Sequence, residues 1–267
     1  MQVTTPLVSL GGFDSIETSA DPKAFVTWMS LQRQFGPDSG IAALKLSPTD
    51  RVLDLGCGPG ADSKTLREHT EHVVGLDLSQ SMVTKAISET PTASFVVADG
   101  QALPFCDNTF DAVWMRLVLI HTPNPAATMN EIARILKPGG RIVLTEPDQG
   151  SHLVATPHND IFERVRAHRR TTFRHPTIGR NLPELAINAG LTITKSWVNP
   201  VQFRSFAIAR AAGGPFDVAT AEAITAGAIT AEEGALYLQS LEDLDKRGAF
   251  CLLGATVSVR ASKIQPN

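Results

Sequence analysis

The chain has 267 residues, a formal net charge of −3 and a hydrophobic content of 43%. This composition is typical of a soluble globular protein, and the weak acidity argues against broad attraction to nucleic acid or anionic membrane. There is no signal-peptide pattern or membrane-length apolar run, and the three widely spaced cysteines fit a reducing compartment, so we expect a cytoplasmic location.

The first 47 residues are predicted to contain two helices. An Asp-Pro pair at residues 21–22 is a helix-start signal, and this helix should extend to residue 35 before a Gly-Pro pair ends it. A second short helix is expected over residues 41–46.

A glycine-rich stretch, RVLDLGCGPG, occupies residues 51–60. The apolar run up to Asp54 favours a strand that is covered on both faces. Gly56 and Gly58 permit backbone angles closed to other residues and let a ligand approach the main chain. Pro59 suits the first turn of a helix. A strand, a glycine turn and a helix N-terminus together predict a nucleotide-type site.

The glycine pattern alone leaves two nucleotide-binding interpretations open. Gly56, Gly58 and Ala61 also satisfy the dinucleotide pattern G-x-G-x-x-G/A. Asp77 ends the expected second strand, where an acid can accept two hydrogen bonds from ribose hydroxyls. The alternative is that Asp77 caps the helix that opens at Ser79.

Two further strands are expected, over residues 94–98 and 110–115. The first leads into the sequence ADGQALPF, whose Asp-Gly pair favours a turn on its own. The second leads into Arg116 and His121. The sequence RILKPGGR at residues 134–141 then predicts a tight reversal before a fifth strand over residues 141–146.

In this order, these stretches resemble the motifs of the class I S-adenosylmethionine (SAM)-dependent methyltransferases. The resemblance covers about residues 52–146, more than a third of the chain. It implies SAM as the cofactor and an α/β fold with a Rossmann-like sheet. The sheet would have seven strands, mostly parallel with an antiparallel last strand, and helices on both faces.

The resemblance also implies roles for individual residues. The glycine turn would face the methionine end of SAM, and Asp99 would accept from the exocyclic amine of adenine. Arg116 would pair with the cofactor carboxylate, with a structural ion pair left open. His121 is the most attractive general base, although packing is the interpretation that we favour. The expected cofactor-binding residues are Asp54, Gly56, Cys57, Gly58, Gly60, Asp77, Leu78, Asp99, Gly100, Gln101 and Arg116.

Beyond residue 146 the sequence is less informative. A helix over residues 159–171 begins a basic segment whose arginines have helical spacing, which predicts either a solvated face or capture of an acidic or phosphorylated substrate. An alanine-rich insert follows, expected to be helical from residue 231 to residue 246. Strands are expected over residues 191–198 and 249–263. The arginines of the basic segment are Arg166, Arg169, Arg170 and Arg174.

We therefore expect one methyltransferase domain over residues 1–267. It would combine an N-terminal helical cap (1–47), a core sheet (48–200 and 248–263) and a helical insert over the substrate pocket (205–247). In open α/β sheets, ligands bind beyond the carboxyl ends of the strands, where such an insert would lie.

The predicted function is methyl transfer from SAM to the oxygen, nitrogen or carbon of a small molecule, such as a metabolite or natural product. A cyclase or a non-catalytic SAM-binding module is an alternative, because its binding motifs would be identical. An NAD(P)-dependent oxidoreductase is less favoured, because it does not usually carry the Asp99 turn. We expect no metal, nucleic acid or membrane partner, and leave homodimer formation open.

Overall fold

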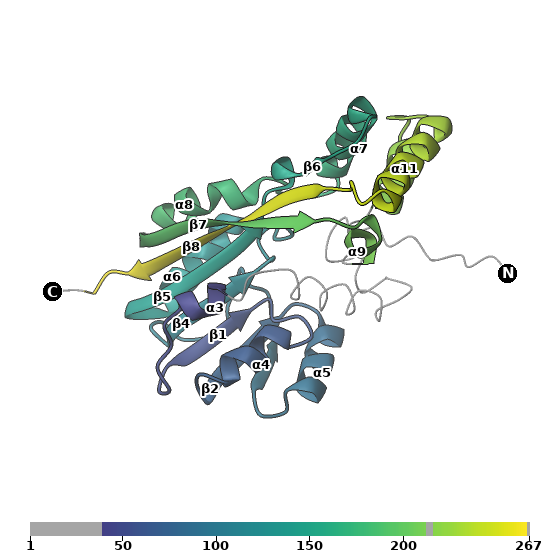
Figure 1. Ribbon diagram of the computed structural model, residues 1–267. Coiled ribbons are helices and arrows are strands. Elements are labelled where there is room, and N and C mark those ends of the chain that lie inside the picture. Colours follow the sequence, from purple (N-terminus) through teal and green to yellow (C-terminus); the bar gives the residue numbers. More distant parts are fainter. Residues whose placement is uncertain (1–38, 212–215, 266–267) are drawn as a thin grey trace. The chain divides into compact units, whose positions relative to one another are not determined.

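The computed structural model describes residues 39–211 and 216–265 (Figure 1). The predicted helix over residues 21–35, and with it most of the predicted cap, lies outside them. The described residues divide into two compact units. We call residues 39–147, 177–199 and 256–265 the sheet unit, and residues 148–176, 200–211 and 216–255 the helical unit.

The sheet unit contains five parallel neighbouring strands in the spatial order β3-β2-β1-β4-β5. Next to β5 lies β8, which is antiparallel to it and also pairs with β7. The strands are β1 (Arg51–Leu55), β2 (His72–Asp77), β3 (Ser94–Val97), β4 (Phe110–Arg116), β5 (Leu136–Pro147), β7 (Leu191–Phe203) and β8 (Leu252–Lys263).

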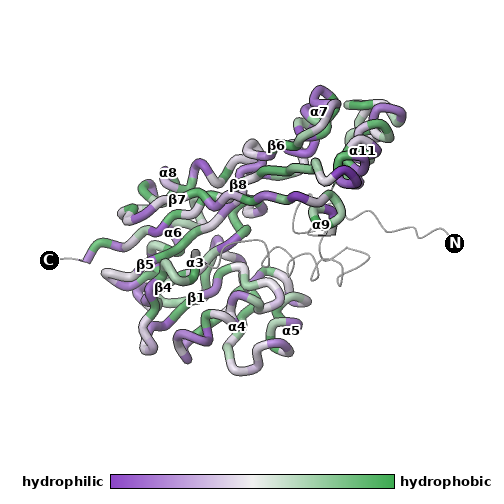
Figure 2. Tube along the Cα trace, in the orientation of Figure 1, coloured by the Kyte–Doolittle hydropathy of each residue, from purple (hydrophilic) through white to green (hydrophobic). Residues whose placement is uncertain are grey.

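Helices cover both faces of this sheet because its central strands are mainly apolar and buried (Figure 2). On one face, side chains of α3 and α4 pack against Val52, Trp114 and Val143. The following strand residues point to the opposite face, where α6 and α8 pack against β5 and each other. The helices of this unit are α3 (Ser39–Ala43), α4 (Ala61–Arg67), α5 (Gln80–Glu89), α6 (Pro125–Ile135) and α8 (Ile178–Asn188).

This arrangement confirms the predicted mostly parallel α/β sheet with an antiparallel last strand. The predicted number of strands was wrong, because the sheet has eight strands within the described residues. The additional strand is the two-residue β6 (Leu153–Val154), which lies in the helical unit and pairs with the first residues of β8. A strand this short leaves no periodic pattern in the sequence.

The fifth strand also begins five residues earlier than predicted, at Leu136. Phe110 pairs with Leu136 and Ala112 pairs with Arg141, so extra residues of β5 bulge out between the two pairs. Gly139, at φ +76°, allows this bulge. The Lys-Pro-Gly-Gly sequence therefore distorts a strand that continues through it, whereas a turn was expected to precede the strand.

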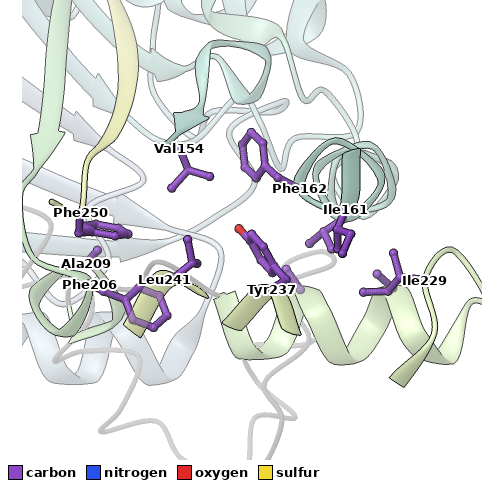
Figure 3. Packing of buried hydrophobic residues seen from close by; sticks show 12 residues of the cluster. Val154, Ile161, Phe162, Phe206, Ala209, Ile229, Tyr237, Leu241 and Phe250 are labelled. Atoms are coloured by element: carbon purple, nitrogen blue, oxygen red, sulfur yellow. The ribbon is translucent and has the colours of Figure 1, made fainter. Parts of the chain in front are cut away.

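The helical unit has its own apolar core (Figure 3). Tyr237 of α11 stacks on Phe162 of α7, with 6.4 Å between ring centroids. The predicted helix over residues 231–246 is confirmed as α11, and a capping box between Thr230 and Glu233 fixes its start. The unit contains η1 (Gln149–Ser151), α7 (Asn159–Thr171), α9 (Phe206–Ala211), α10 (Phe216–Thr225) and α11 (Ala231–Lys246).

Candidate functional site

The glycine turn between β1 and α4 lies in the sheet unit, and its three glycines differ in their surroundings. All three have positive φ: +74° at Gly56, +49° at Gly58 and +83° at Gly60. A Cβ atom at Gly56 would lie 2.2 Å from Cγ2 of Val118, and one at Gly60 would lie 3.0 Å from Cα of Ala86. A Cβ at Gly58 would have no atom within 4 Å. Packing therefore requires glycine at two positions, and the third faces open space.

Asp54 lies inside the protein beneath this turn. It is 2% exposed, and its carboxylate accepts a hydrogen bond of 2.5 Å from the Ser63 hydroxyl. Burial, together with the charge of Asp62, raises the pKa of Asp54 to about 7. Cys57 is also buried as a free thiol, and burial raises its pKa. Both side chains support the turn from within and do not face solvent.

Arg116 at the end of β4 pairs with a carboxylate of the protein. Its Nε donates to Oδ2 of Asp62 at 2.9 Å, and the indole Nε1 of Trp114 donates to the same oxygen at 3.0 Å. Asp62 stands in the first turn of α4. The structural ion pair left open by the sequence is thus present, and it fastens α4 to β4.

Asp77, the proposed ribose acid, is only 2% exposed. Its two oxygens accept the backbone N–H groups of Gly58 at 2.8 Å and Ser79 at 2.9 Å. Burial raises the pKa of Asp77, and these hydrogen bonds oppose the rise. The carboxylate joins the glycine turn to the start of α5, and the adjacent Leu78 side chain is 53% exposed. The end of β2 therefore presents a buried acid beside an exposed apolar side chain.

The turn after β3 is an ordered loop. Oδ1 of Asp99 accepts the Gln101 backbone N–H at 2.9 Å, and Oε1 of Gln101 accepts the Asn124 N–H at 3.1 Å. A Cβ at Gly100 would lie 3.4 Å from Cδ1 of Leu55. This turn therefore approaches both the end of β1 and the start of α6, while the Asp99 side chain stays exposed.

Arg134, which was predicted only as part of a turn, holds the same loop. Its Nη1 donates to the Phe105 carbonyl at 2.7 Å and its Nη2 to the Leu103 carbonyl at 3.0 Å. Glu131 pairs with Arg134 and accepts the Leu103 N–H at 2.7 Å. These contacts fix the loop after β3 to α6.

The strand order brings most of the predicted residues to one edge. Because β3, β2, β1 and β4 are parallel neighbours, the segments after their carboxyl ends meet at the same side of the sheet. Those segments carry the Asp99 turn, Asp77, the glycine turn and the loop that ends at His121. His121 is partly buried, and burial lowers its pKa to about 4. It is therefore neutral near pH 7.

Glu146, at the end of β5, was not among the predicted site residues. It is fully buried and accepts the backbone N–H groups of Val118 at 2.8 Å, Leu119 at 2.7 Å and Ile120 at 3.3 Å. Burial raises the pKa of Glu146 to about 7. The signal available in the sequence was an acid at the end of the strand expected over residues 141–146.

The basic segment of the helical unit does not form one solvated face. Arg166 donates to the carbonyls of Gly150 and His152 and pairs with Glu163. Arg169 is 7% exposed and pairs with Glu222 at 3.1 Å. Arg170 is partly buried and Arg174 is exposed. The first two arginines therefore hold the unit together, which neither sequence interpretation anticipated.

No group of three or more His, Cys, Asp or Glu side chains is arranged to hold a metal ion within residues 39–211 and 216–265. Among the same residues, no helix is both long enough and apolar enough to cross a membrane.

Part of this chain is similar to known proteins. Residues 53–144 match the methyltransferase domain family. A demethylmenaquinone methyltransferase of Beutenbergia cavernae is 34% identical over 136 residues, which are 51% of this chain and 56% of that protein. The chain spans about half the length of the first curated relatives it matches: 46%, 56% and 56%.

Solved structures share the fold at low sequence identity. A Bacillus halodurans protein assigned as a methyltransferase has a TM-score of 0.61 at 20% identity, covering 85% of this chain and 100% of that one. The [4+2]-cyclase SpnF has a TM-score of 0.56 at 22% identity, covering 88% and 81%. These likenesses show that the chain has the fold of these proteins, and the match over residues 53–144 supports the resemblance to SAM-dependent methyltransferases seen in the sequence.

Proposed function

We propose that this chain transfers a methyl group from SAM to a small-molecule acceptor, and that SAM binds along the strand-end edge of the sheet unit. The observation that carries the proposal is the open space in front of Gly58, beside Asp77 and within a matched methyltransferase domain. Glycine at this position lets a ligand reach the backbone, and the helix N-terminus behind it offers N–H donors.

Residues at this edge of the sheet would suit the parts of SAM. Asp77 uses some of the four acceptor positions of a carboxylate on the backbone, and the remaining ones suit ribose hydroxyls. The exposed side chain of Leu78 suits the face of adenine, and the exposed Asp99 carboxylate suits its exocyclic amine. Because Arg116 is paired with Asp62, we assign it a structural role in holding α4.

Bound SAM supplies an electrophilic methyl group on a sulfonium sulfur. The glycine turn, Asp77 and Asp99 would hold this cofactor, and the acceptor would take the methyl group from its sulfur–carbon bond. Positioning of the acceptor in line with that bond can supply much of the rate. His121 is neutral near pH 7 and is the candidate base for an oxygen or carbon acid nucleophile.

The matched domain does not identify the acceptor. We propose that the exposed Arg174 favours an anionic one. A screen of acceptors with methyl-labelled SAM identifies the substrate. A preferred neutral acceptor would exclude the role of Arg174.

The alternative function is SAM binding without methyl transfer, as in a cyclase or a non-catalytic module. SpnF shows that a cyclase can have this fold, but a sequence identity of 22% does not indicate a shared function. Transfer of the labelled methyl group to any acceptor would separate methyl transfer from this alternative.

Calorimetry with SAM, S-adenosylhomocysteine and NAD tests the cofactor. We expect heat of binding with the first two and little with NAD. Tight NAD binding without a SAM signal would refute the assignment and favour an oxidoreductase.

Asp77→Asn tests the site at the level of one residue, with Ser79→Ala as its control. Both changes weaken the start of α5, because Ser79 caps that helix and Asp77 accepts the backbone N–H group of Ser79. Only Asp77 also holds Gly58, so only Asp77→Asn should weaken SAM binding, by about 1.5–3 kcal/mol. Equal SAM affinities in the two folded variants would mean that Asp77 is merely a cap.

A further inference from the structure

Three successive backbone N–H groups of the loop after β4 end on one carboxylate. Oε1 of Glu146 accepts from Val118 and Leu119, and Oε2 accepts from Ile120, at 2.8, 2.7 and 3.3 Å. Glu146 is fully buried, and a buried carboxylate is costly unless hydrogen bonds replace its lost hydration. The same three N–H groups would be costly to bury without an acceptor. The acid and the loop thus stabilise each other.

The loop needs this support because its first residue is strained. Leu117 has φ +60°, in the left-handed region that costs a residue with a side chain about 1–2 kcal/mol. Its N–H group is held by the Thr145 carbonyl at 2.9 Å, one residue before Glu146. The end of β5 therefore fixes four consecutive N–H groups of the loop.

The next residue of the loop presses on the glycine turn. The side chain of Val118 occupies the space where residue 56 would carry a Cβ atom, so this glycine and this valine are packed in direct contact. A shift of Val118 would change the space that supports the turn. Further along, the same loop ends at His121, whose N–H group bonds to the Val118 carbonyl at 3.0 Å.

We propose that Glu146 is a positioning residue of the methyltransferase site: it holds the backbone from Val118 to Ile120 so that the loop supports the glycine turn. It acts through Val118 and need not touch the cofactor. This inference rests on the proposed function, because it assigns the glycine turn to SAM. Only a carboxylate offers acceptors on both oxygens, so glutamine of the same shape would turn an N–H₂ group towards an N–H donor.

The variant Glu146→Gln tests the proposal, with Thr145→Val as the matched control. Thr145 is the preceding buried residue of β5, and its hydroxyl bonds across the sheet to Ser258 at 2.8 Å. In Glu146→Gln we expect the Kd for SAM to rise about tenfold and the amides of Val118 and Leu119 to exchange faster with solvent. Thr145→Val should lose a similar amount of stability while both quantities stay as in the parent.

An NMR titration of the parent protein also tests the proposal, without any substitution. The amide protons of Val118 and Leu119 bond directly to the carboxylate, so their NMR shifts should move as Glu146 titrates between about pH 5 and about pH 9. The amide of Leu117 bonds to a carbonyl and should not move with them. Asp54 titrates in the same range, but its partner is the Ser63 hydroxyl, and His121 titrates near pH 4.

Two results would overturn the inference. One is a folded Glu146→Gln that binds SAM as tightly as the parent, and the other is the absence of any titration at Val118 and Leu119. A parent protein that does not bind SAM would instead refute the proposed function, and the exchange and titration results would still report on the loop.

Discussion

The two units of this protein bury charge in different ways. In the sheet unit, the buried acids Asp77 and Glu146 accept backbone N–H groups of segments at the strand ends. In the helical unit, the buried cation is Arg169 of α7, which pairs with Glu222 of α10, and the buried acid Asp148 accepts the N–H group of Gly150. The Nε and Nη2 atoms of Arg169 have no hydrogen-bond partner among the described residues.

The difference lies in what each buried charge holds. A carboxylate that accepts several N–H groups fixes the path of a loop, which is what a ligand site between strand ends requires. An arginine that pairs with a carboxylate joins two helices and leaves their backbones unchanged. We therefore expect changes in the helical unit to affect stability, and changes in the strand-end loops to affect ligand binding as well.

The largest effect expected in the helical unit is that of Arg169→Met. The change leaves Glu222 partly buried without its cation, and the free energy of unfolding should fall by about 3 kcal/mol, at the low end for a buried pair because Glu222 keeps some contact with water. Urea unfolding measures the fall, and Arg174→Met, at an exposed arginine of the same segment, is the control. Weaker SAM binding by Arg169→Met at unchanged stability would contradict the expected difference between the two units.

A pair of glycines tests the same distinction with a smaller effect. Gly58 in the sheet unit and Gly227 in the helical unit both have positive φ, +49° and +71°, and neither would place a Cβ near another atom. Alanine at either position should cost about 1–2 kcal/mol of stability through backbone strain. Only Gly58→Ala should also weaken SAM binding, by about 1–3 kcal/mol, because the new methyl group enters the space proposed for the cofactor. Calorimetric titration of both variants with SAM measures this difference. Equal affinities would mean that SAM does not occupy the space in front of Gly58.

The smallest effect is expected for His121→Gln. Turnover should fall by less than about 100-fold, the lower bound expected for loss of a general base, and SAM affinity should remain. The pKa of His121 in the folded protein, about 4, lies below the ordinary value of 6.5. Between these two pH values the unfolded chain binds more protons than the folded one. The parent therefore loses stability as the pH falls from 6.5 to about 4. Urea unfolding at neutral pH and near pH 5 measures this effect. The free energy of unfolding of the variant, relative to that of the parent, should be higher near pH 5 than at neutral pH. A larger loss of turnover with intact folding would make His121 the base.

The fold of the sheet unit could be predicted because its signals are local. The apolar run before Asp54, the glycines that follow and the acid after the next strand lie within short stretches of chain, and each has its own backbone requirement. The predicted helix over residues 231–246 was found at the same bounds because a capping box marks its start. The bulge in β5 could not be predicted, because it depends on the pairing of that strand with β4.

The site could be predicted only in part, because many of its contacts join distant parts of the chain. The residues that lie at the strand ends were identified, but their partners come from distant parts of the chain. Glu146 lies 28 residues from Val118, and Asp62 lies 54 residues from Arg116. Neither contact leaves a periodic pattern, so only the structure shows that the loop after β4 is held by an acid and that Arg116 is already paired.

The pairing of β5 with β8 has a consequence for synthesis of the protein. Thr145 and Ser258 lie opposite each other in this ladder, although 113 residues separate them along the chain. At translation rates of about 5–20 residues per second, β5 waits roughly 6–23 s for its partner strand. During that interval the nascent chain carries an apolar strand with one unpaired edge, the kind of surface on which chains pair with one another and chaperones bind.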